Sequence, residues 1–124
     1  MQTSKNQSFL ARLRFAWAGV AHGVRAEHSL RFHVCALGLV LIVLAVFRPE
    51  PEWWAMVIIA CAAVISAELF NTAIEHLADH LHPELHPSIR IVKDCAAAAV
   101  LVTSLAALGV AAALAIHLAA RTAF

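Results

Sequence analysis

Three apolar segments constrain this chain more than any other feature. They cover residues 32–47, 53–77 and 95–120. The last two exceed the roughly 20 apolar residues that a helix needs to cross a hydrocarbon layer of about 30 Å. The first is shorter, but it can gain a turn from Ser29–Arg31, whose arginine can reach the membrane surface. Because 62% of the residues are hydrophobic, more than a small soluble domain can bury, we predict an all-α integral membrane protein with three transmembrane helices.

The predicted membrane spans cover residues 29–48, 53–78 and 94–120. A helix of another kind is predicted ahead of them, over residues 8–27. Its apolar residues recur at spacings of three and four, and arginines lie between them, which is typical of an amphipathic helix in the membrane surface. Packing against the other helices of the chain explains the same pattern equally well. We expect a single membrane domain over residues 1–124 and no cleaved signal, because no apolar stretch follows the first basic residues.

The distribution of basic residues predicts the orientation of the helices. Five Lys and Arg residues precede or begin the first span and two lie between the second and third spans, against one in the first connection and one at the C-terminal end. They are Lys5, Arg12, Arg14, Arg25, Arg31, Arg90 and Lys93, against Arg48 and Arg121. Since basic residues concentrate on the cytoplasmic side, we expect a cytoplasmic N-terminus and an external C-terminus. The net charge of +1 argues against a nucleic-acid partner.

The end of the second span carries a row of polar residues. Starting from Glu68, they follow at +3, +4, +7 and +11, which places them within roughly 100° of one another around a helix. They are Asn71, Thr72, Glu75 and Asp79. Counting about 20 residues inward from Trp53 places the hydrocarbon boundary near Thr72, so Glu68 lies roughly 6 Å inside the apolar layer. Ionisable groups in a span are costly and indicate function.

A helix end with solvated surface charges is the simplest alternative explanation. It accounts for Asp79, Glu84 and Arg90, which follow the predicted boundary. It does not account for Glu68 and Asn71, which precede it. We therefore favour a functional interpretation of the polar row.

Carboxylates from separate segments are expected at this same membrane face. They are Glu27, Glu68, Glu75, Asp79 and Asp94. So many acids repel one another unless a cation or protons intervene, and oxygen ligands suit Mg²⁺, which shares its remaining positions with water and phosphate. Lys93 suits a phosphate oxygen. The chain has no glycine-rich phosphate loop, so side chains and Mg²⁺ would have to position the phosphates.

The block Glu68-Leu-Phe-Asn71-Thr72-Ala-Ile-Glu75, followed by Asp79, resembles the signature of the prokaryotic diacylglycerol kinase family, which includes the undecaprenol kinases. Lys93-Asp94 with the small residues 96–100 resembles a second block of that family. Glu27 with Arg31 and His33 resembles the stretch before its first span. The similarity extends from about Phe9 to Gly109, which is most of the chain.

The resemblance implies a Mg²⁺- and ATP-dependent lipid kinase of the bacterial inner membrane, usually a homotrimer. Its acceptor would be diacylglycerol, giving phosphatidic acid, or undecaprenol with the same mechanism. Glu68 would be the general base in contact with the lipid, supported by Asn71. The other roles that the resemblance implies are metal ligands Glu27 and Glu75; ATP contacts Glu27, Glu75, Glu84, His86, Lys93 and Asp94; and a lipid contact by Arg31.

The chain departs from the diacylglycerol branch of this family at two places. Phe15 stands where that branch tends to have a tyrosine that helps to bind the nucleotide. The loop from His82 to Ile89 looks more like the proline-bearing loop of the undecaprenol kinases. Both departures bear on the choice of lipid acceptor.

Two rival classes of protein stay open. A small proton- or metal-coupled transporter would also place an ionisable residue in a span, and His76 and His80 lie one helical turn apart, as metal ligands can. Against it, the outer halves of the predicted spans carry no charge. A structural membrane subunit would use the alanine-rich third span for close helix packing. ATP-dependent phosphorylation of membrane lipid, measured against metal uptake in vesicles, separates kinase from transporter.

Overall fold

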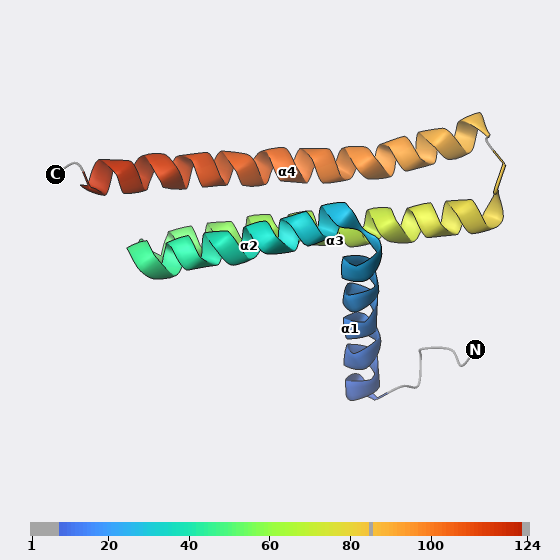
Figure 1. Cartoon of the computed structure of the whole chain (residues 1–124), viewed down its shortest axis with the longest axis horizontal. Helices are drawn as coiled ribbons and strands as arrows, with labels where there is room; N and C mark the ends of the chain where they lie inside the picture. Colours follow the sequence, from blue (N-terminus) through green and yellow to red (C-terminus); the bar gives the residue numbers. More distant parts are fainter. Residues whose placement is uncertain (1–7, 85, 123–124) are drawn as a thin grey trace.

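The computed structural model describes residues 8–84 and 86–122, which form four helices (Figure 1). The helices are α1 (Phe9–Ala26), α2 (His28–Phe47), α3 (Pro51–Leu81) and α4 (Pro87–Thr122). The last three are long and apolar enough to cross a membrane, which confirms the all-helical fold with three candidate spans. Lys5, one of the basic residues behind the predicted orientation, lies outside the described residues.

The helices α2, α3 and α4 run alongside one another, whereas α1 stands crosswise to them (Figure 1). The chain turns at Glu27, whose backbone is extended with φ −106° and ψ 125°. Gly23 allows the helices to approach each other closely at this corner. A Cβ atom on Gly23 would lie 2.8 Å from Leu30 Cδ2 and 2.9 Å from Leu69 Cδ2. The absence of a side chain at Gly23 therefore lets α1 pack directly against α2 and α3, at the level of Leu69.

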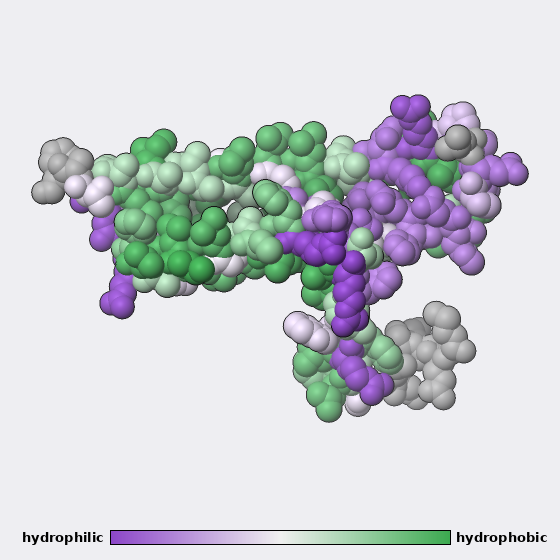
Figure 2. Space-filling view, viewed as in Figure 1, coloured by the Kyte–Doolittle hydropathy of each residue, from purple (hydrophilic) through white to green (hydrophobic). Residues whose placement is uncertain are grey.

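Beyond this corner, α3 and α4 continue together as a long hairpin (Figure 1). The helix α3 ends where the His82 N–H donates to the carbonyl of Ala78 at 2.9 Å, and α4 begins at Pro87, a residue suited to the first turn of a helix. Hydrophilic residues gather over the hairpin and the α1–α2 corner, whereas apolar residues cover most of the rest of the bundle, with a few hydrophilic ones at its opposite end (Figure 2). The membrane face at which the sequence predicts a group of carboxylates therefore corresponds to the hairpin end of the bundle.

The best-buried apolar core lies near the opposite end, where the three long helices meet. It consists of Leu44, Val57, Leu114 and Leu118, with Trp53 and Trp54 packed against it. Elsewhere burial is sparse: the most apolar windows of α2, α3 and α4 are only 11%, 22% and 6% buried. The remaining apolar side chains need lipid or another protein around them.

Candidate functional site

Glu68 is the most deeply buried polar residue of the described chain, with 2% of its surface exposed. It lies on α3 and faces the first turns of α2. The Ser29 hydroxyl donates a hydrogen bond of 2.9 Å to Glu68 Oε2, and His33 Nδ1 lies 2.9 Å from Glu68 Oε1. The Thr72 hydroxyl donates to the backbone carbonyl of Glu68 at 3.0 Å. The carboxylate is therefore held against α2, away from the surface.

His33 extends this polar group to the third helix. Its Nε2 atom lies 3.4 Å from the Ser104 hydroxyl on α4. On its other side, the contact between Nδ1 and Glu68 Oε1 is short but out of line for a hydrogen bond, and both atoms are buried without a hydrogen-bond partner. We call Ser29, His33, Glu68 and Ser104 the Glu68 cluster. It joins all three candidate spans.

Only one member of this cluster, Glu68, is predicted from the sequence as a catalytic residue. Ser29 and His33 are four residues apart, so a helical α2 places them on one face, and this spacing is the signal that could have indicated them. Ser104 gives no signal of its own, because hydroxyls in an apolar helix commonly bond to the backbone one turn back, as its neighbour Thr103 does.

The next turn of α3 carries the predicted residues Asn71 and Glu75. The Asn71 side-chain amide donates to Glu75 Oε1 at 2.9 Å, so the two side chains orient each other. Asn71 Oδ1 is buried and has no hydrogen-bond partner. A carboxylate and an unsatisfied amide oxygen are the hard oxygen donors that Mg²⁺ prefers. The residues present therefore fit this ion.

Protein ligands alone do not complete a metal site here. Over residues 8–84 and 86–122, no group of three or more His, Cys, Asp or Glu side chains is placed to hold a metal ion. A cation at Glu75 would have to complete its coordination with water or phosphate oxygens, which is usual for Mg²⁺. Such an ion would therefore bind together with a phosphate ligand.

The predicted ATP contacts of the loop and of α4 come together around the α3–α4 hairpin. A cavity of about 450 Å³ is lined there by Glu84, His86, Lys93 and Asp94. Lys93 makes an ion pair with Asp79 across the hairpin, and Arg90 Nε lies 3.8 Å from Asp94 Oδ2. We call these six residues the hairpin cluster. Unlike Glu68, they are exposed, apart from the half-buried Lys93.

Glu27 and Arg31 lie at the α1–α2 corner. Glu27 is half-buried and precedes the first turn of α2, and its carbonyl accepts from the Arg31 N–H at 3.3 Å. Among the described residues, no hydrogen bond or ion pair joins the Glu27 carboxylate to Glu68 or Glu75. Ser29, two residues after Glu27, donates to Glu68 Oε2, so the corner adjoins the polar row of α3.

An apolar cavity of about 350 Å³ lies between α2, α3 and α4. His33 and Ser104 are polar groups in its wall. Most of the other lining residues are apolar, and they include Phe32 of α2, Val57 of α3 and Val110 of α4. The cavity thus places a member of the Glu68 cluster against a space that suits a hydrocarbon chain.

Comparison with known proteins identifies a family and two relatives. The model of the family described as prokaryotic diacylglycerol kinase matches residues 14–115, a range that contains all the predicted site residues. A diacylglycerol kinase from Synechocystis sp. is 32% identical over 101 residues, which are 81% of this chain but only 58% of that protein. An undecaprenol kinase from Bacillus subtilis is 34% identical over 87 residues, 70% of this chain and 71% of that protein.

Proposed function

Because the chain belongs to the prokaryotic diacylglycerol kinase family, we propose that it is a membrane lipid kinase, which transfers the γ-phosphate of ATP to a lipid hydroxyl. The observation that carries this proposal is the Glu68 carboxylate, which is 2% exposed on a candidate span. Keeping a carboxylate there is costly, but a carboxylate held in one orientation can serve as a general base for an alcohol. Ser29 and His33 hold it.

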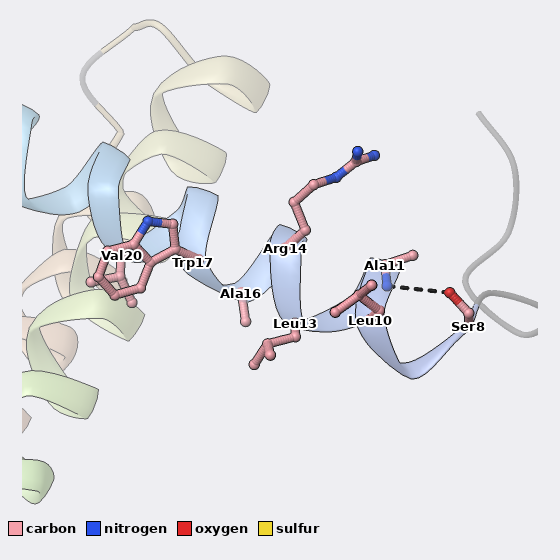
Figure 3. Close-up of a pocket in the computed structure, with 8 residues that line it drawn as sticks. All are labelled: Ser8, Leu10, Ala11, Leu13, Arg14, Ala16, Trp17 and Val20. Carbon is pink, nitrogen blue, oxygen red and sulfur yellow. Dashed lines mark hydrogen bonds between the residues drawn. The ribbon is translucent and has the colours of Figure 1, made fainter.

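The position of α1 supports a site just below the membrane surface. Gly23 of α1 approaches Leu69, the residue after Glu68. Five large apolar side chains of α1 are exposed, and three of them, Leu10 (73%), Leu13 (55%) and Trp17 (72%), line one groove. Arg14 also lines this groove, and its side chain extends away from that of Leu13 (Figure 3). We propose that α1 lies in the membrane surface on its apolar side, which places Glu68 within reach of a lipid headgroup.

The acceptor that we propose is diacylglycerol, which would be converted to phosphatidic acid. Undecaprenol is the alternative, and it is favoured by the match to the undecaprenol kinase of Bacillus subtilis. Both lipids place a hydroxyl at the membrane surface and a hydrocarbon chain below it. The apolar cavity beside His33 offers that chain a binding place, and Arg31 at the α1–α2 corner would contact the headgroup.

Mg²⁺ would be held by Glu75, oriented by Asn71, and by Glu27 from the α1–α2 corner. When bound, the ion would neutralise charge on the phosphate oxygens. The remaining nucleotide contacts are assigned to Glu84, His86 and Asp94, which line the hairpin cavity. Lys93 lines it too, and its pair with Asp79 is partly exposed. Such pairs contribute only about 0–1 kcal/mol, so Lys93 can exchange Asp79 for a phosphate oxygen.

In the proposed reaction, Glu68 takes the proton from the lipid hydroxyl as that oxygen attacks the γ-phosphorus. The bond between the γ-phosphorus and the bridging oxygen breaks, and ADP leaves. Phosphoryl transfer depends mainly on positioning and charge neutralisation. The proposed base and one metal ligand lie on α3, the other metal ligand lies at the α1–α2 corner and the lysine lies on α4. This placement is consistent with that requirement.

We further propose that the protein is a homotrimer in the bacterial inner membrane, with the hairpin in the cytoplasm. The sparse burial of the three long helices supports packing between protomers. The concentration of hydrophilic residues at the hairpin (Figure 2) supports its exposure to the compartment that contains ATP.

The test of the proposed function uses purified protein, Mg²⁺, γ-labelled ATP and vesicles that contain either diacylglycerol or undecaprenol. We expect label in the lipid, and the preferred acceptor identifies the branch. Glu68→Gln should lower kcat about 10²–10⁴-fold with little change in the KM for ATP. The control is Glu52→Gln, which changes an exposed carboxylate in the first turn of α3. Absence of labelled lipid with either acceptor, or near-normal kcat in Glu68→Gln, contradicts the proposal.

A further inference from the structure

Transfer of a phosphoryl group from ATP to an alcohol releases a proton, which a buried base must pass on before the next turnover. Glu68 is 2% exposed, so it has little direct contact with water. The Ser29 hydroxyl donates to Oε2, so it would have to rotate away from the carboxylate before it could pass a proton on. The remaining side-chain contact of the carboxylate is His33, and imidazole groups serve as proton shuttles in proteins.

A single shared proton would satisfy both atoms of the contact between Glu68 and His33. Glu68 Oε1 and His33 Nδ1 are 2.9 Å apart, both are buried, and neither has a hydrogen-bond partner. A proton on either atom would give both of them a partner once the ring turns into line. Catalytic hydrogen bonds are often poorly aligned before substrate binds, so the misaligned contact is compatible with transfer.

The second imidazole nitrogen, Nε2, lies on the side of the ring away from Glu68. His33 is 22% exposed where Glu68 is 2% exposed, and its Nε2 atom faces the Ser104 hydroxyl at 3.4 Å. Among the described residues, the ring contacts Glu68 of α3 and Ser104 of α4, and Cys61 of α3 is the other titratable residue that lines the cavity beside it. No Lys, Arg, Asp or Glu of the described residues lines this cavity. A positive charge on His33 is therefore balanced by Glu68 alone.

On the basis of the proposed kinase function, we propose that His33 is a positioning residue that holds Glu68 Oε1 and accepts its proton after each transfer. The O–H bond on Oε1 breaks and an N–H bond forms on Nδ1. The Nε2 proton then passes to water, with the Ser104 hydroxyl as its first contact. This returns Glu68 to the carboxylate and leaves the neutral ring with its proton on Nδ1. Before the next transfer the ring turns and exchanges that proton for one on Nε2 through water, which restores the starting tautomer. A purely structural histidine would hold the carboxylate without exchanging protons.

The experiment compares wild type, His33→Gln and His33→Ala in the lipid kinase assay across a range of pH. We expect His33→Gln to lower kcat roughly 10–100-fold, with the KM for ATP changed less than about twofold. Because His33 must be neutral to accept the proton, wild-type kcat should fall as the pH is lowered, and both variants should lack this fall. Added imidazole should restore part of the kcat of His33→Ala, in proportion to its neutral form.

The matched control is His117→Gln, because His117 also contacts a glutamate at 2.9 Å but lies at the other end of the bundle. It should keep the wild-type kcat and pH profile. Thermal unfolding in detergent establishes that each variant is folded. Wild-type kcat and pH profile in His33→Gln, or loss of kcat without any imidazole rescue in a folded His33→Ala, overturns the role of His33. The kinase proposal itself fails only if the wild type does not phosphorylate lipid or Glu68→Gln stays active.

Discussion

The Glu68 cluster and the hairpin cluster hold acidic groups in opposite ways. In the first, a 2%-exposed carboxylate is contacted by side chains from a neighbouring helix. In the second, the acids are exposed, and their partners are the flexible side chains of Lys93 and Arg90. The first arrangement fixes one orientation because a buried carboxylate without partners is costly. The second arrangement does not fix the orientation of its side chains, because exposed ion pairs contribute only about 0–1 kcal/mol to stability.

This difference matches two different demands of the proposed reaction. A base must be in position before the substrate arrives, since misplacement lowers the rate of the chemical step. A nucleotide site must instead exchange its internal ion pairs for ligand contacts on every turnover. We therefore expect substitutions in the hairpin cluster to change substrate affinity and leave stability alone. Substitutions in the Glu68 cluster should change stability and kcat.

Among substitutions that compare the two clusters, Lys93→Gln in the hairpin cluster is expected to have the largest effect. A hydrogen bond to a charged group contributes roughly 1.5–3 kcal/mol, which corresponds to about a 10- to 100-fold rise in the KM for ATP. The midpoint of thermal unfolding should not change measurably, because the pair with Asp79 is partly exposed. Steady-state kinetics and thermal unfolding in detergent test both parts.

Arg121→Gln is the control for Lys93→Gln, since it also removes one positive charge but at the other end of the bundle. It should leave the KM for ATP unchanged. If Lys93→Gln lowers stability as much as it weakens ATP binding, Lys93 is a structural residue and the proposed contrast between the clusters is wrong.

The sequence predicted the helices and the polar row of α3 but not the partners of Glu68. Three long apolar segments leave few alternatives to membrane-spanning helices, and the 3.6-residue period places Asn71 and Glu75 near Glu68 on α3. Which helix faces Glu68 depends on how α2 packs against α3, and that depends on the close approach at Gly23. No local pattern encodes such a contact. The spacing of Ser29 and His33 therefore indicates a shared face of α2, but only the folded structure shows that this face meets Glu68.

The second contrasting substitution is Ser29→Ala, which removes the hydroxyl that donates to Glu68 Oε2. The net loss of one such hydrogen bond should lower the free energy of unfolding by on the order of 1 kcal/mol. We also expect a several-fold lower kcat, because the carboxylate loses one of the contacts that orient it, whereas the KM for ATP should not change. Chemical denaturation in detergent and steady-state kinetics measure these effects.

Ser66→Ala is the matched control for Ser29→Ala, because it removes an exposed hydroxyl from α3. It should have neither effect. A wild-type stability and kcat in Ser29→Ala would mean that the orientation of Glu68 does not depend on α2, and the distinction between a fixed and an adaptable cluster would not hold.

The smallest effect concerns a third group, Glu50 with His117 and Arg121, at the end of the bundle opposite the hairpin. Backbone hydrogen bonding at Glu50 lowers the pKa of its carboxyl below the ordinary value of 4.5; burial opposes this, and the His117 hydrogen bond and the Arg121 charge reinforce it. A lowered pKa means that the contribution to stability is present above about pH 4.5 and is lost as the pH falls through the lowered pKa. The measurement is thermal unfolding in detergent between neutral pH and pH 3.

Glu50→Gln should remove that part of the acid-dependent loss of stability, whereas Glu52→Gln, two residues further along, should keep it. Neither substitution should change kcat or the KM for ATP, since the group lies far from the hairpin. An exposed cluster that stabilises without affecting catalysis would show that exposure alone does not make the hairpin cluster functional. What distinguishes the hairpin is that its acids and bases surround a cavity, whereas Glu50 closes a contact between the start of α3 and the end of α4. A change in the KM for ATP in Glu50→Gln would contradict this separation.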